Sequence, residues 1–277
     1  MAKTLKPKTL RLQFRNIQET LDYMAKSPGG SSEKERSADS TFTRLPNWPA
    51  CERAIQFGWP EGLKAVSGLV ESLSAFVGSG MLKETFRPAV SGLFFDVGLV
   101  LSGEPEAWLE TTETEEETKG SKVVTLALNC TVSGCVPAAT IEARGAAMLA
   151  LAVLLERSGR SVRVVVGDAT TRDGSYLYAE TVVKEAGEPF DLDKLAFWLV
   201  CPDVLRRCFF RICEASPLRE HVDARMGGGY GCPVESWTPE GDITLKGILS
   251  ETAWTPEASR RWIVEQLKAQ GVQFSEA

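Results

Sequence analysis

The sequence predicts a mixed α/β protein in which helices cover a β-sheet. Three features of the C-terminal half carry this prediction. Runs of β-branched and apolar residues at 122–130, 161–167 and 176–184 are typical of strands, and the first is apolar on both faces, like a covered strand. The segment 141–157 is apolar almost all round, as expected for a helix buried between a sheet and its neighbours. Strands that alternate with helices in this way form a sheet with helices packed on it.

The other elements of this half follow from local signals. Asp173 and Gly174 predict a tight turn between the second and third of these strands. Pro202 cannot continue a helix without strain, so we expect it to divide the helical pattern of 190–215 into two segments. The half is completed by a glycine run at 227–231, a strand at 243–249, and a helix that begins at the N-cap Thr255 and stops at Gly271.

Two polar breaks divide the chain. The segment 27–41 is small, polar and charged, which predicts a mobile loop, and 111–120 is a glutamate-rich loop. The division gives a smaller α+β part at 1–110 and an α/β domain at 121–277. Within the first part we expect helices at 16–26 and from Gly62 onward, and a strand at 93–101.

The composition favours a soluble protein of the cytoplasm. The net charge of −6 argues against a nucleic-acid partner, because binding to phosphates needs clustered positive charge. The 7 cysteines lie mostly in apolar runs, and His221 is the single histidine, so we expect buried reduced thiols and no zinc site. No run approaches the roughly 18 uncharged apolar residues of a membrane span, so no membrane association is expected.

One group of polar residues stands where a ligand would bind. Asn129, Thr131 and Ser133 lie at the end of the strand at 122–130 and just after it, at the position where open α/β sheets place their ligands. Their alternate spacing would let three oxygens converge above the strand. In the alternative interpretation, these side chains only cap the following helix and satisfy the loop.

This loop resembles the metal-ion-dependent adhesion site of von Willebrand factor A domains, whose first loop reads Asp-x-Ser-x-Ser. The order of the elements over 121–274 is also similar. The resemblance implies a von Willebrand A-like C-terminal domain with Thr131 and Ser133 as metal ligands, and it adds Gly228, Tyr230 and Glu251 to the binding residues. Asn129 replaces the leading aspartate of the family, and an amide holds a divalent cation less well than a carboxylate. We therefore expect no cofactor beyond a weakly held Mg²⁺.

A second resemblance covers most of the chain. The phrases GWPEG at 58–62, GEPE at 103–106 and RGAA at 144–147, and the stretch 190–214, are similar to an uncharacterised family of bacteriophage proteins. This resemblance implies a virus-encoded protein of the host cytoplasm without a known enzymatic role.

The sequence favours a binding role over catalysis. It contains no G-x-S-x-G elbow and no Cys–His signature, so we expect no enzyme. We expect a protein-interaction or assembly module that binds a protein partner, or a second copy, through the carboxyl edge of its sheet. Aromatic side chains are enriched at interface centres, and the candidates here are Trp108, Trp237 and Trp254.

Two other functions stay open. A nucleic-acid-associated replication or packaging factor would use Arg206, Arg207 and Arg211 on one helical stretch. A carboxylate- or metal-dependent hydrolase would need Asp96, Asp168 and Glu180 to meet in space. A basic surface stripe would favour the first, and carboxylates converging in a pocket would favour the second.

Overall fold

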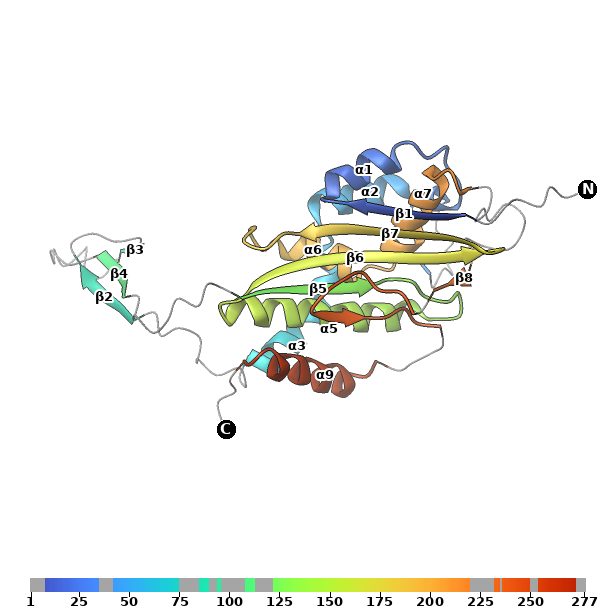
Figure 1. Cartoon of the computed structure of the whole chain (residues 1–277). Helices are drawn as coiled ribbons and strands as arrows, with labels where there is room; N and C mark the ends of the chain where they lie inside the picture. Colours follow the sequence, from blue (N-terminus) through green and yellow to red (C-terminus); the bar gives the residue numbers. More distant parts are fainter. Residues whose placement is uncertain are drawn as a thin grey trace, which may run out of the picture.

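A computed structural model describes most of the chain. It describes residues 8–34, 42–74, 85–89, 94–95, 108–112, 122–219, 232–234, 236–249 and 254–272. A six-stranded mixed sheet flanked by helices dominates these residues (Figure 1). The predicted mixed α/β class is therefore confirmed.

The sheet has two halves of opposite direction. Its order is β1-β7-β6-β5-β9, and the short β8 pairs with β6. Strand β5 is parallel to β6 and β9, whereas β7 is antiparallel to β6 and parallel to β1. The arrowheads of β1 and β7 in Figure 1 therefore point away from those of β5, β6 and β9. The strands are β1 (Thr9–Phe14), β5 (Val123–Asn129), β6 (Ser161–Arg172), β7 (Ser175–Lys184), β8 (Cys232–Pro233) and β9 (Ile243–Leu245).

Strand β5 lies inside the sheet, between β6 and β9, as the apolar pattern of 122–130 predicted. The turn that joins β6 and β7 is also confirmed. Asp173 and Gly174 both have positive φ, 48° and 75°, which is the conformation of a two-residue hairpin turn. The strand predicted at 243–249 is shorter than expected, because regular pairing covers only β9 and continues as one bridge between Val132 and Ile248.

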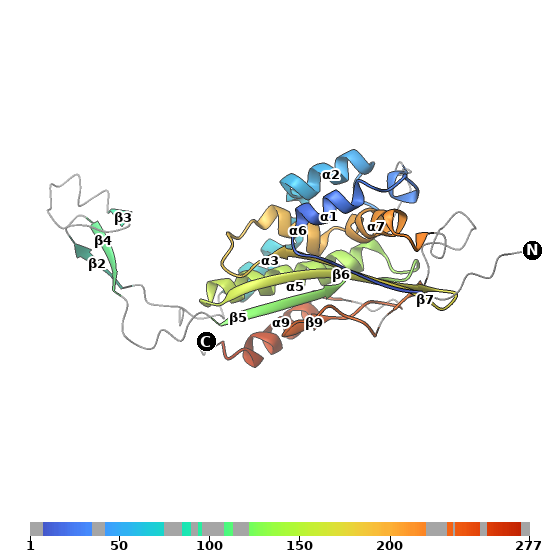
Figure 2. The ribbon, with the colours of Figure 1, turned by 45° about the horizontal axis from the view of Figure 1, so that its top comes forward.

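Helices cover one face of the β1–β7–β6 region, as Figure 2 shows for α1, α2, α6 and α7. Helix α5 packs against α3, α6 and α9. Chain division at Pro202 is confirmed, since α6 ends before it and the π-helical turn η3 follows. The helices and turns are α1 (Ile17–Met24), η1 (Ser31–Glu33), α2 (Trp48–Phe57), η2 (Pro60–Gly62), α3 (Leu63–Ser74), α5 (Ala138–Arg157), α6 (Leu192–Val200), η3 (Val204–Phe209), α7 (Phe210–Ala215) and α9 (Pro256–Ala269).

Helices α5 and α6 approach each other closely at Gly145. A Cβ atom at Gly145 would lie 1.9 Å from the carbonyl oxygen of Leu199, so only glycine fits there. By length and composition α5 could cross a membrane, although Glu142 and Arg144 interrupt its apolar run. It is mostly buried inside the protein, and this burial is consistent with a soluble protein.

Within 1–110, strand β1 and helices α1 to α3 share one sheet and one core with 121–277. Strand β1 pairs with β7 along its whole length. Met24 and Ile55 belong to the same buried hydrophobic cluster as Leu151 and Phe197. The segment 27–34, expected as part of a mobile loop, packs against η3 and α7 instead, because buried charged groups there bind it (see below).

A second, small sheet has the antiparallel order β2-β4-β3. It consists of β2 (Thr85–Ala89), β3 (Phe94–Phe95) and β4 (Trp108–Thr112). Of the strand expected at 93–101, the structure describes only β3.

Candidate functional sites

The loop after β5 holds a buried polar cluster. Asn129 is fully buried, and its Nδ2 donates hydrogen bonds to the carbonyl oxygens of Trp237, at 2.6 Å, and Val234, at 3.4 Å. Its Oδ1 accepts from the backbone N–H of Thr131 at 2.9 Å. The Asn129 side chain therefore ties the end of β5 to the segment 234–237.

Thr131 binds the next strand. Its Oγ1 donates to Oδ1 of Asp168 at 2.6 Å and accepts from the backbone N–H of Ala169 at 2.8 Å. Asp168 is 5% exposed. Burial raises the pKa of Asp168 to about 6, although the hydrogen bonds of Thr131 and Ala169 and the charge of Arg206 lower it.

Two arginines border this cluster. Arg144 of α5 is 3% exposed and donates to the carbonyl oxygens of Asn129 and Lys246, so it joins the ends of β5 and β9. Burial lowers the pKa of Arg144 to about 10. The guanidinium of Arg206 lies 5.0 Å from the ring centroid of Phe42, and burial lowers its pKa while Asp168 raises it.

Each of the three side chains predicted to hold Mg²⁺ has a hydrogen-bond partner within the chain. The hydroxyl hydrogen of Thr131 points to Asp168, and one lone pair of its oxygen takes the Ala169 N–H. The hydroxyl of Ser133 contacts Cys135 Sγ at 3.3 Å. The oxygens of Asn129, Thr131 and Ser133 thus have three different partners. Among the described residues, no three His, Cys, Asp or Glu side chains are grouped as metal ligands.

The predicted carboxylate trio is not brought together either. Asp168 and Glu180 face opposite sides of the sheet, because Asp168 is opposite Ala179 while Glu180 is opposite Gly167, and side chains alternate along a strand. Asp96 lies outside the described residues, as do Gly228, Tyr230 and Glu251.

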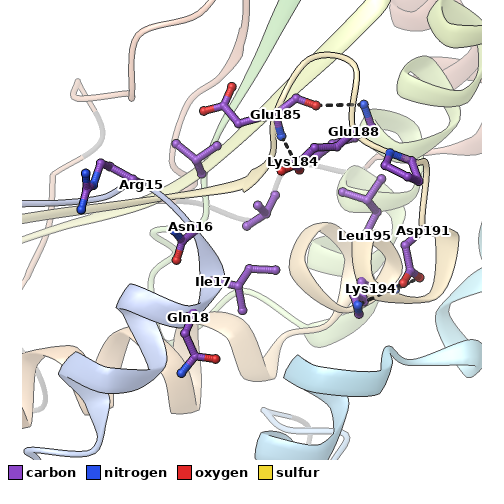
Figure 3. A pocket seen from close by; sticks show the side chains of 13 residues that line it. Arg15, Asn16, Ile17, Gln18, Lys184, Glu185, Glu188, Asp191, Lys194 and Leu195 are labelled. Carbon is purple, nitrogen blue, oxygen red and sulfur yellow. Dashed lines mark hydrogen bonds and ion pairs between the residues drawn. The ribbon is translucent and has the colours of Figure 1, made fainter.

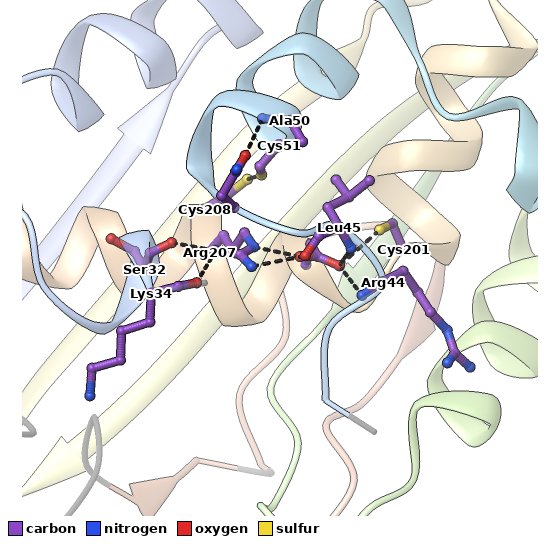
Figure 4. A network of polar contacts seen from close by, with 11 residues as sticks. Ser32, Lys34, Arg44, Leu45, Ala50, Cys51, Cys201, Arg207 and Cys208 are labelled. Atoms are coloured by element: carbon purple, nitrogen blue, oxygen red, sulfur yellow. Dashed lines mark hydrogen bonds and ion pairs between the residues drawn. The ribbon is translucent and has the colours of Figure 1, made fainter. Parts of the chain in front are cut away.

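A second polar network joins η3 to the N-terminal segments (Figure 4). Arg207 is 2% exposed and forms a 2.7 Å ion pair with the fully buried Asp203. It also donates to the carbonyl oxygens of Ser32, at 2.8 Å, and Leu45, at 2.9 Å. Beside it, the Sγ atoms of Cys51 and Cys208 lie 3.7 Å apart.

Arg211 and Glu214 extend this network along α7. Arg211 pairs with Glu33 at 2.6 Å and lies over the ring of Trp48 at 4.2 Å. Glu214 accepts hydrogen bonds from Ser27 and Ser32. Arg207 and Arg211 are therefore buried, and both are paired within the chain.

The open face of the sheet carries an aromatic cluster. The rings of Tyr176 and Tyr178, on β7, are stacked with centroids 6.1 Å apart, and Trp237 packs 5.5 Å from Tyr178. The guanidinium of Arg11, on β1, lies over the Tyr178 ring at 4.2 Å. A Cβ at Gly167 would lie 2.7 Å from the Trp237 ring, so this glycine lets the tryptophan approach β6.

A groove of about 600 Å³ adjoins this cluster on the same face. Polar and charged groups line most of it, but several are paired. Arg163 binds Glu185 at 3.1 Å, and Gln13 donates to Glu180 at 2.8 Å. Trp237 and Glu240 contribute from the segment after β8. The lining residues are Arg11, Gln13, Phe14, Arg15, Arg163, Val165, Glu180, Val182, Trp237, Thr238 and Glu240.

A second cavity, of about 460 Å³, lies at the carboxyl ends of β1 and β7 (Figure 3). The first turns of α1 and α6 border it, and their N–H groups are capped by Asn16 and Asp191. Arg15 and Val182 line both this cavity and the groove, so the two are adjacent. The sequence placed the ligand site at the carboxyl end of β5, whereas the cavity lies at the opposite edge of the sheet.

The three tryptophans predicted at an interface have different surroundings. Trp237 is half-buried beside the groove. Trp254 is half-buried and packs edge-on against Trp262, with centroids 5.8 Å apart. Trp108 lies in β4, and its side chain is outside the described part of the structure.

The family of the chain comes from comparison with known proteins. The family model described as "Domain of unknown function (DUF7192)" matches residues 2–273. The chain belongs to the DUF7192 family. No curated protein and no solved structure matches this DUF7192 chain. Neither the bacteriophage nor the von Willebrand A resemblance is confirmed by these comparisons.

The main element that sequence reasoning missed in this DUF7192 chain is β1. Its residues TLRLQF alternate, with Leu10, Leu12 and Phe14 on one face and Arg11 and Gln13 on the other. That period of two is the signal of a strand covered on one face. Without β1, neither the groove nor the cavity could be located from the sequence.

Proposed function

We propose that this protein is a non-enzymatic binding protein that docks a protein partner on the open face of its sheet. The observation that carries the proposal is the aromatic cluster of Tyr176, Tyr178 and Trp237 beside the groove. Tyrosine and tryptophan bury a large area on binding and are enriched at interface centres. Tyr176 is 36% exposed, so this side chain has area left to bury.

The charges near the groove favour a protein over a nucleic acid. Arg15 is paired with Glu19 and Arg163 with Glu185, and Glu180 and Glu240 also line the groove. A nucleic-acid site would need positive charge that is free to replace counterions. Mixed and partly neutralised charges are typical of protein interfaces.

The carboxyl edge that takes part in this proposal is that of β1 and β7. The groove and the adjacent cavity reach it, whereas Asn129 and Thr131, at the end of β5, are buried and hydrogen-bonded. The two resemblances add context: a phage-encoded protein of the host cytoplasm with a degenerate von Willebrand A-like arrangement around β5.

The test compares two aromatic substitutions. Tyr178→Ala removes the centre of the cluster, while Phe57→Ala removes an aromatic ring that is 71% exposed on α2. Each purified variant is used as bait for binding proteins from a lysate of the cell that produces the protein. We expect Phe57→Ala to retain, and Tyr178→Ala to lose, the protein that the unaltered chain captures. Equal capture by both variants would contradict the proposal.

A further inference from the structure

We propose that the partner binds as an extended peptide segment that adds a strand to the outer edge of β1, with acidic and apolar side chains in alternation. This inference rests on the proposed function and names the partner class for the same face of the sheet. Three features support it: the outward backbone groups of β1, the side chains on its two faces, and the charge of Arg11.

The outer edge of β1 has backbone groups that no described residue binds. The backbone N–H of Tyr176 donates to the carbonyl oxygen of Lys8 at 2.8 Å, and β1 pairs in parallel with β7 from there on. In a parallel strand, the backbone N–H and C=O groups of every second residue bond to the same neighbouring strand. The backbone groups of Lys8, Leu10 and Leu12 therefore point toward β7. The N–H and C=O groups of the residues between them point outward. No described residue bonds to these outward groups of Thr9, Arg11 and Gln13.

The side chains beside this edge specify the pattern of the added strand. Leu10 and Leu12 are half-buried and pack on a small hydrophobic cluster of Leu177, Cys213 and Leu218, which is separate from the main core. An added strand would place every second side chain next to these leucines, where apolar residues would cover them. Strand addition combines main-chain hydrogen bonds with such alternate side-chain contacts.

The other side chains of the added strand lie beside Arg11. Arg11 is exposed, has no ion pair with a described residue, and lies over the face of the Tyr178 ring. An acidic side chain opposite Arg11 would therefore meet a positive charge that no described residue pairs.

The same charge argues against a second copy of the chain as the added strand. Thr9, Arg11 and Gln13 are the three outward residues, with Arg11 in the middle. A two-fold pairing of β1 with β1 centred on these residues would put the two Arg11 side chains directly opposite each other, which is unfavourable. The charge pattern therefore selects a different, acidic chain.

The test uses a fluorescein-labelled ten-residue peptide of alternating Glu and Val, measured by fluorescence anisotropy with the full chain. We expect saturable binding that Arg11→Glu weakens at least tenfold and Arg11→Lys retains. The same peptide with Lys in place of Glu should bind at least tenfold more weakly. Equal binding of the Glu and Lys peptides, or no effect of Arg11→Glu, would overturn the inference.

Two N-methylated peptides test strand addition directly. In one the amides of all Glu residues are methylated, and in the other those of all Val residues. The two sets of amides point to opposite sides of an extended strand, so only one set can bond to β1. We expect one peptide to lose binding and the other to retain it. If the peptide methylated at its Glu amides loses binding, the strand is added antiparallel to β1. If the peptide methylated at its Val amides loses binding, the strand is added parallel to β1. Retention by both peptides, or loss by both, would overturn the inference.

Other occupants give different results. If light scattering shows a dimer and Arg11→Glu abolishes that dimer, the edge binds a second copy of the chain. If the protein binds single-stranded DNA in a salt-sensitive way and Arg11→Glu abolishes this binding, the edge binds nucleic acid. Either result would overturn the inference. If Tyr178→Ala abolishes partner capture but the Glu–Val peptide does not bind, the strand-addition inference fails and the proposed function stands.

Discussion

Thr131 and Asp168, which are 37 positions apart, form a buried hydrogen bond of 2.6 Å from the threonine hydroxyl to the carboxylate. This bond joins the loop after β5 to the neighbouring strand β6. The bond also shows that a motif that resembles a metal site in sequence can have a structural role. The hydroxyl of Thr131, which was expected to bind a cation, donates a hydrogen bond to the carboxylate of Asp168.

The carboxyl group of Asp168 makes the stability of the protein depend on pH. Because burial raises its pKa from 3.8 to about 6, the folded state holds this proton over a range where the unfolded chain has lost it. The contribution is fully present below the unfolded pKa and is lost as pH rises through about 6. The loss is at most about 3 kcal/mol, from 1.36 kcal/mol per pKa unit.

Asp168→Asn removes this titration and keeps an oxygen that can accept from Thr131. We expect the variant to gain stability over the unaltered protein as pH rises from 4 to 7. Urea unfolding of both proteins across that range measures the difference. A stability difference that is the same at pH 4 and pH 7 would contradict this prediction.

The ion pair of Asp203 and Arg207 is expected to be essential for folding. Asp203→Ala leaves a buried guanidinium without its carboxylate, which costs about 3–5 kcal/mol. The control is Lys194→Ala, which breaks an exposed pair with Asp191 and should cost less than about 1 kcal/mol. Chemical denaturation of both variants checks the contrast, and similar losses in the two would show that burial does not control the energy of these pairs.

The crossing of α5 and α6 predicts a strong effect of a single methyl group. Gly145→Ala forces the helices apart, since the added carbon would lie 1.9 Å from the Leu199 oxygen. We expect the free energy of unfolding to fall by about 1–3 kcal/mol. At Gly134 an added Cβ meets nothing within 4 Å, so Gly134→Ala should change stability by less than about 0.5 kcal/mol. Thermal unfolding compares the two, and an unchanged melting temperature of Gly145→Ala would show that the crossing is looser than described.

The thiols should fall into two reactivity classes. Cys135 and Cys232 are exposed, whereas the other five are buried. Burial raises the pKa of Cys51, Cys130, Cys201, Cys208 and Cys213, which keeps them as unreactive thiols. A thiol reagent such as Ellman's should therefore modify two groups rapidly in the native protein and all seven after denaturation. Rapid reaction of three or more native thiols would contradict the described burial.

The sequence predicted the interior of the fold better than its edges. Strand β5, helix α5 and the β6–β7 hairpin have strong local signals, namely apolar runs and the Asp173–Gly174 turn, and all three were located correctly. The site was harder to predict because it depends on a contact with no local signal. Arg11 and Tyr178 are 167 positions apart, and only the pairing of β1 with β7 brings them together.

The burial of several polar residues was not predicted, for a related reason. Asn129, Thr131, Arg207 and Arg211 look like surface groups, since such side chains are mostly exposed in proteins. Each is buried here with partners from other segments: Asp168 for Thr131, Glu33 for Arg211, and the carbonyl oxygens of Ser32 and Leu45 for Arg207, whose carboxylate partner Asp203 lies four positions before it. Sequence alone does not reveal partners that lie tens of residues away.

The parallel pairing of β1 with β7 has a consequence for how the chain is made. Strand β1 leaves the ribosome well before β7, because the two strands pair across 167 positions of the chain. At the usual 5–20 residues per second, roughly 8–30 s of synthesis separate the two strands. Contacts of such long sequence separation also form slowly. Until β7 arrives, both backbone edges of β1 and the apolar face of Leu10 and Leu12 lack the partner strand, so the newborn protein should need protection from aggregation at β1.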